Sequence, residues 1–137
     1  MWYAKIAKDI SHIPDAVLYY EDELLEARKE VRLIGNVERA AAALPGVVEQ
    51  RFSQLQEIEA ILEQLNIQLR KIRSAKFRQF TEHYNRALTS RDAEKYVDGE
   101  PEVCDMDAIV NEFALVRNKF LGLTKALDIK QWQLSNV

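Results

Sequence analysis

Five basic side chains fall within nine residues of this chain, and no acidic side chain interrupts them. They are Arg70, Lys71, Arg73, Lys76 and Arg78. Cations at this density neutralise phosphate groups along a nucleic-acid backbone. Aromatic rings follow at Phe77, Phe80 and Tyr84. Such rings either stack on the bases of single strands, at about 1–3 kcal/mol per base, or pack within the protein and brace the helix. The pattern is typical of sequence-tolerant binding to single-stranded nucleic acid.

The net charge of the whole chain hides this basic segment. The chain has 19 basic and 22 acidic residues, a formal net charge of −3. Residues 70–95 carry eight basic and three acidic side chains, a net +5, while the three remaining segments are each acidic. A second interpretation therefore stays open, in which the basic residues belong to a solvated helix end and pair with acidic helices elsewhere in the fold.

Other side chains that often do chemistry are poorly placed for it. His12 and His83 are far apart and lie in no metal-binding motif. Asp105-Met106-Asp107 suits the start of a helix better than a metal site, with Asp105 as the N-cap. The single cysteine, Cys104, excludes a disulfide within the chain and a zinc site built on cysteines. We expect no enzymatic activity and no cofactor or metal.

The elements that must position the basic segment are helical. Four Gly and three Pro in 137 residues leave the apolar spacing of three and four residues almost unbroken. We expect helices over 14–34, 46–88 and 104–135, a short connecting helix near 40–44, and another from the Thr89 cap through Tyr96. No segment alternates like a strand, so the predicted fold class is all-α, long heptad-bearing helices in a single domain over 1–137.

Two of the apolar seams indicate extensive helix packing. The second seam comprises Leu55, Ile58, Leu62, Leu65, Leu69 and Ile72, with Lys76 at its next position. The third comprises Ile109, Phe113, Val116, Phe120, Leu123, Leu127 and Leu134. The helix over 46–88 has about 43 residues, or about 64 Å. Such a rod needs partner helices from its own chain or from other subunits.

No apolar run approaches the length of about 18–20 residues that spans a membrane. The N-terminus lacks the layout of a signal peptide. We therefore expect a cytoplasmic protein that does not contact a membrane.

From Ile58-Glu59-Ala60 through Lys76-Phe77-Arg78 to Tyr84, the chain resembles the UvsY family of recombination mediators from T-even-type bacteriophages. The likeness continues through Ser90-Arg91-Asp92 and on to Leu123 and Leu127. It covers about residues 40–130, with no single motif specific enough to stand alone.

The resemblance implies a non-enzymatic factor that acts in phage recombination and repair, in the host-cell cytoplasm. Such a protein binds single-stranded DNA, displaces a single-strand-binding protein and helps a RecA-like recombinase to load. The family's Lys-x-Arg pair matches Lys76 and Arg78. The resemblance also implies a homo-oligomer, a hexameric or heptameric ring, with the C-terminal helix and its seam serving oligomerisation. The alternative is a coiled-coil assembly or adaptor protein that binds no nucleic acid.

Overall fold

The structure is a computed structural model that describes residues 1–32, 37–82 and 88–135, with all their side chains except those of 37–41 and 134–135. Its elements are α1 (Trp2–Lys8), the 3-10 turn η1 (Ile10–His12), α2 (Ile13–Val31), α3 (Val37–Glu82), α4 (Ser90–Asp98) and α5 (Pro101–Ser135). Every element in these described ranges is helical, which confirms the predicted all-α class.

The chain divides into two compact units that share its two longest helices. The first comprises Met1–Ile61 and Phe113–Val137, and the second comprises Leu62–Glu112. Both α3 and α5 run continuously through the division. The single domain expected over 1–137 stays a prediction.

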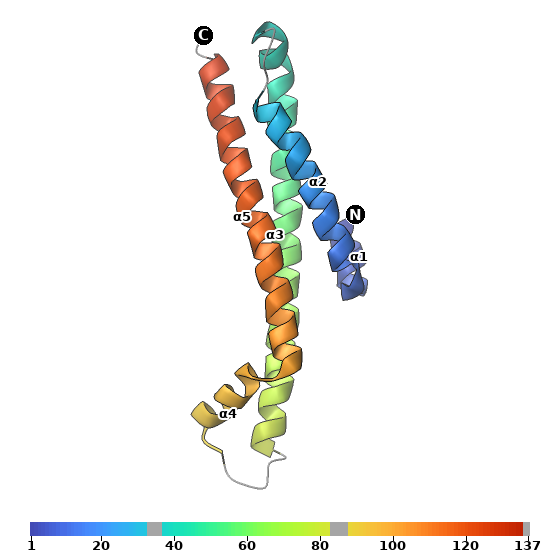
Figure 1. The fold of residues 1–137 in the computed structure, drawn as a ribbon, viewed down its shortest axis with the longest axis vertical. Helices are drawn as coiled ribbons and strands as arrows, with labels where there is room; N and C mark the ends of the chain where they lie inside the picture. Colours follow the sequence, from blue (N-terminus) through green and yellow to red (C-terminus); the bar gives the residue numbers. More distant parts are fainter. Residues whose placement is uncertain (33–36, 83–87, 136–137) are drawn as a thin grey trace. The chain divides into compact units, whose positions relative to one another are not determined.

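In the first unit, α2 and the later part of α5 run antiparallel to the first part of α3 (Figure 1). Tyr20 of α2 lies at the centre of this bundle, with its ring edge-on to Phe113 at 6.2 Å and to Phe120 at 5.9 Å. All three rings are buried. Edge-to-face aromatic packing of this kind joins α2 to α5.

The hydroxyl of Tyr20 also joins α2 to α3. It donates a 2.6 Å hydrogen bond to Glu57 Oε1, which also accepts from the backbone N–H of Trp2 at 3.2 Å. The chain's amino group lies 3.7 Å from the other oxygen of Glu57. This one carboxylate therefore connects α1, α2 and α3.

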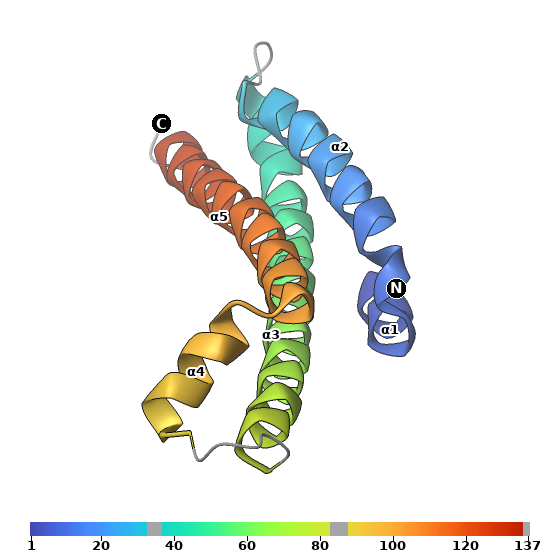
Figure 2. The ribbon, with the colours of Figure 1, turned by 60° about the horizontal axis from the view of Figure 1, so that its bottom comes forward.

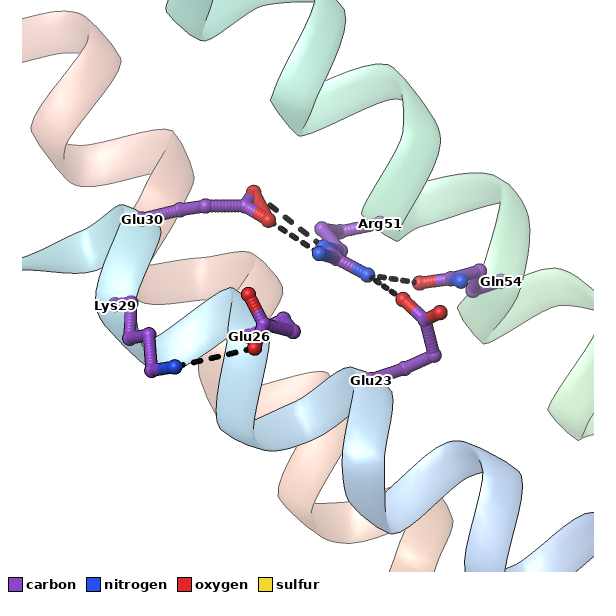
Figure 3. A network of polar contacts seen from close by, with 6 residues as sticks. All are labelled: Glu23, Glu26, Lys29, Glu30, Arg51 and Gln54. Carbon is purple, nitrogen blue, oxygen red and sulfur yellow. Dashed lines mark hydrogen bonds and ion pairs between the residues drawn. The ribbon is translucent and has the colours of Figure 1, made fainter.

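A buried arginine forms the second polar connection between α2 and α3 (Figure 3). The side chain of Arg51 is only 4% exposed and forms ion pairs with Glu23 and Glu30 of α2. It also donates a 2.8 Å hydrogen bond to Gln54. Burial would raise the pKa of Glu23, but the hydrogen bonds from Arg51 and Gln54 outweigh it, so this pKa lies below its ordinary value. The sequence analysis did not single out Arg51.

Helix α2 covers a slightly different range from the predicted 14–34. It begins at Ile13, with Pro14 in the first turn, where a missing N–H costs no hydrogen bond. It ends at Val31, and Arg32 is its C-cap. The last two predicted residues, 33–34, lie outside the described residues.

Helix α3 begins nine residues before the predicted start at Gly46 and absorbs the connecting helix expected near 40–44. Pro45 therefore lies inside a helix, where proline costs about 3 kcal/mol. The run of alanines before it favours helix, and the neighbouring Leu44 is fully buried. These two gains explain why the proline does not end the helix. The described helix stops at Glu82, short of the predicted Leu88.

Helix α5 begins at Pro101 rather than at residue 104. Proline is favoured at the first helical position because its fixed φ suits the helix. Asp105 consequently lies within the helix, and its predicted role as N-cap is wrong. The predicted cap of α4 is confirmed, because the Thr89 side chain accepts a 3.2 Å hydrogen bond from the backbone N–H of Asp92. Helix α1 was not predicted, since seven residues show too little periodicity.

Candidate nucleic-acid interface

The basic segment occupies consecutive turns of α3 in the second unit, and this unit also supplies carboxylates to it. Two of its bases pair across helices: Arg73 with Asp98 of α4 at 2.7 Å, and Lys76 with Glu102 of α5 at 3.3 Å. Figures 1 and 2 show α4 beside the last turns of α3. The sequence left open whether acidic helices pair with the basic residues. These two ion pairs show that they do so for Arg73 and Lys76.

The other three bases lie on more open faces of α3. Arg70 pairs with Glu63 at 3.5 Å and Arg78 with Glu82 at 3.4 Å, both within α3. Lys71 is exposed and forms no ion pair with any residue that the structure describes. The side chain of Arg78 is the most exposed of the paired bases, at 71%. The segment therefore presents cations to solvent on several sides.

Lys76 differs from the other bases because it continues the apolar seam of α3. Its side chain is only 22% exposed, and its ammonium group lies against Glu102. Upstream, Leu62 and Leu65 are buried, whereas Leu69 and Ile72 are only half-buried. The seam therefore becomes more exposed to solvent along α3. Where its burial ends, the ion pair between Lys76 and Glu102 replaces an apolar contact.

The ion pairs of this segment are easy to exchange. The carboxylates of Asp98 and Glu102 are 61% and 60% exposed. Exposed ion pairs contribute only about 0–1 kcal/mol each, because water and salt screen them. A phosphate group that approaches Arg73 or Lys76 has a weak competitor to displace.

The aromatic residues beside the bases have different environments. Phe80 stacks on Tyr96 of α4, with ring centroids 5.4 Å apart and planes at 26°. Phe77 is half-buried on α3. Phe80 therefore braces α4 against α3 rather than presenting both faces of its ring. Tyr84 lies outside the described residues.

The third seam has a partner within its own chain. Phe113, Val116, Phe120, Leu123 and Leu127 are all buried. Ile109 is half-buried, and the side chain of Leu134 lies outside the described ones. The five buried residues form the core of the first unit, so a single chain accounts for their spacing. They are not an exposed surface for oligomerisation.

Other apolar side chains of the first unit remain exposed. Those on α3 and α5 are Phe52, Leu115, Ile129 and Trp132. A hollow of about 280 Å³ lies between Phe52, Leu121 and Lys125, and a second of about 420 Å³ is lined by Ile129 and Trp132. These exposed residues lie outside the apolar seams, so the seams did not predict this surface.

Two further features are absent from the residues that the structure describes. No group of three or more His, Cys, Asp or Glu side chains is placed to hold a metal ion among them. None of the described helices is long and apolar enough to cross a membrane.

No protein-family model, curated protein or solved structure matches this chain.

Proposed function

We propose that this protein is a recombination mediator of the UvsY type that binds single-stranded DNA through residues 70–78 of α3. The observation that carries the proposal is the acid-free run of five bases on a helix where the carboxylates that pair with them are exposed and exchangeable. Cations on several sides of one helix suit a flexible single strand, which can wrap around it.

The finer parts of the proposal rest on the family resemblance. The protein acts in the host-cell cytoplasm, forms a homo-oligomeric ring and helps a RecA-like recombinase to replace single-strand-binding protein on DNA. A ring repeats the basic segment once per subunit. Weak contacts from each copy then add along one strand and give high avidity.

A second candidate is the adaptor protein that binds no nucleic acid. The observation that favours it is the pairing of Arg73 and Lys76 with carboxylates of α4 and α5. In that case the basic segment serves to hold the second unit together, and its substitution costs stability rather than DNA affinity.

Binding of a fluorescently labelled oligonucleotide separates the two candidates. Lys76→Ala with Arg78→Ala should weaken binding at least about tenfold, because two of the five phosphate contacts are lost. The matched control is Lys119→Ala with Lys125→Ala, which removes two cations of α5 outside the basic segment. Equal affinity of both double variants, or no binding by the unaltered protein at low salt, would reject the DNA-binding role.

Loading of the recombinase needs a separate assay. Filament assembly on strands coated with single-strand-binding protein should be faster with the mediator than without it. The Lys76→Ala, Arg78→Ala variant should lose this acceleration together with DNA affinity.

A further inference from the structure

Helix α2 buries one face in the first unit and leaves the opposite face open. Its buried residues include Ala16, Tyr20 and Leu24. On the opposite face Leu18 is 64% exposed and Leu25 is 55% exposed. These two leucines are seven residues apart, so they lie one above the other on the helix surface. We call the surface around them the outer face of α2.

The charges of this outer face are ordered along the helix. The exposed acidic residues Glu21 and Asp22 precede Leu25, and the exposed basic residues Arg28, Lys29 and Arg32 follow it. Glu26 also follows Leu25, and it pairs with Lys29. The helix dipole favours the basic residues near the end of α2, but Glu21 and Asp22 lie in the middle of the helix, where the dipole has little effect. The dipole does not explain why Leu18 and Leu25 are exposed, since apolar side chains gain nothing from it.

The residues after Asp22 also border a hollow. Leu25, Arg28 and Lys29 are among the residues that line its volume of about 410 Å³. Among the described residues that line this hollow, all are charged except Leu25. Such a hollow accepts a side chain that is itself apolar and is carried on a helix with the opposite order of charges.

A second copy of α2, turned antiparallel, has that order. Asp22 and Lys29 lie on one flank of the outer face, and Glu21 and Arg28 lie on the other. When two copies cross at Leu25, Asp22 of each therefore lies opposite Lys29 of the other, and Glu21 lies opposite Arg28. Leu25 meets Leu25, and Leu18 lies opposite the aliphatic stem of Arg32. These four charges each meet an opposite charge, whereas a parallel arrangement places like charges together.

We propose that the outer face of α2 is a two-fold, antiparallel contact between two copies of this chain. The contact is self-complementary, so it closes after two copies and leaves no open surface on α2. The existing exposed pair between Lys29 and Glu26 is worth little and can be exchanged on contact. Two leucines per copy make the contact weak and dependent on salt. The inference does not depend on DNA binding by residues 70–78.

Charge exchange tests the contact. Asp22→Arg places a cation opposite Lys29 of the other copy, and Lys29→Asp places a carboxylate opposite Asp22 of the other copy. Each variant alone should weaken association through α2 about tenfold or more, because each substitution occurs twice in a two-fold contact. An equimolar mixture of the two variants should recover association, because a basic flank then meets an acidic one. Glu59→Arg, an exposed charge change on α3, is the matched control and should have no effect.

The readout must report on α2 itself. In a Cys104→Ser background, Leu25→Cys should be joined to its own copy by a short thiol crosslinker, while Leu18→Cys should react far more slowly. The charge variants are then made in the Leu25→Cys chain, and circular dichroism verifies that their helix content is unchanged. Equal crosslinking at the two positions, crosslinking unaffected by Asp22→Arg, or no recovery in the mixture would overturn the proposal.

Discussion

Loss of Arg51 should destabilise the fold, because its side chain is a buried cation between α2 and α3. Its guanidinium group holds the partly buried carboxylates of Glu23 and Glu30 (Figure 3). Arg51→Met keeps the apolar stem but leaves both carboxylates without their cation. We expect the free energy of unfolding to fall by about 2–4 kcal/mol, measured by chemical denaturation. Arg70→Met is the matched control, because Arg70 is exposed, and it should cost less than about 1 kcal/mol.

The same ion pairs predict how stability depends on pH. The folded pKa of Glu23 lies below its ordinary value of 4.5. The stabilisation is therefore present above pH 4.5 and is lost as the pH falls through the lowered folded pKa. Denaturation at a series of pH values should show this loss in the unaltered protein and a smaller one in Arg51→Met. Equal slopes in the two proteins would contradict the assignment of this effect to the Arg51–Glu23 pair.

Tyr20 offers a second residue test. Burial and the hydrogen bond to Glu57 raise the pKa of its hydroxyl far above the ordinary value of 10. Tyr20→Phe keeps the packing against Phe113 and Phe120 and removes only the donor to Glu57. The expected loss is about 1–3 kcal/mol of unfolding free energy, since hydrogen bonds to a charged group are worth that much. The exposed Tyr3→Phe should change the free energy by less than about 0.5 kcal/mol, and an equally small loss for Tyr20→Phe would show that the hydroxyl is unimportant.

At the scale of the elements, α4 and the first turn of α5 each place a carboxylate against the basic segment, where it would compete with bound DNA. Asp98→Asn with Glu102→Gln removes two carboxylates from Arg73 and Lys76 while keeping the shape of both side chains. If DNA binds the basic segment, this double variant should bind a labelled oligonucleotide about 3- to 30-fold more tightly, because its phosphates no longer displace a competitor.

The matched control neutralises two carboxylates that do not contact the basic segment. Asp105→Asn with Asp107→Asn changes the net charge of the chain by the same amount, and both residues are exposed. An equal gain in affinity for both double variants would attribute the effect to net charge rather than to the two ion pairs.

The elements also show how far the sequence alone could go. The spacing of the apolar residues correctly predicted that the long elements are helices. This spacing follows from the 3.6-residue turn of a helix and is the same whichever element packs against it. The start of α3 was missed because Pro45 is a local signal to stop, while burial of Leu44 is a tertiary effect. The third seam was correctly found as apolar. Its partner was not, because spacing does not say whether Tyr20 of the same chain or another subunit covers it.

The basic segment was located from the sequence, but its surroundings were not. Ion pairs between Arg73 and Asp98 join residues on different helices, and no local spacing brings them together. The same holds for Phe80, whose stacking on Tyr96 depends on how α4 packs. The burial of Arg51 could not be predicted from the sequence, because an isolated arginine on a helix is most often exposed.

At the scale of the whole molecule, the charges are unevenly shared. The chain has a net charge of −3, yet residues 70–95 carry +5. The acidic remainder repels nucleic acid in general, so the proposed binding depends on a local site. In the proposed oligomer, each copy adds to the local attraction and to the general repulsion. The affinity of the assembled protein should therefore depend steeply on salt.

The most direct test of DNA binding is the salt dependence of affinity for a labelled single-stranded oligonucleotide. If one basic segment engages five phosphates, a plot of log K against log salt should be linear with a slope of about −3.5. Lys76→Ala with Arg78→Ala should reduce the magnitude of this slope by about 1.4, as two phosphate contacts are lost. No binding at low salt, or a slope that this double variant leaves unchanged, would contradict the assignment of residues 70–78 as the DNA-binding site.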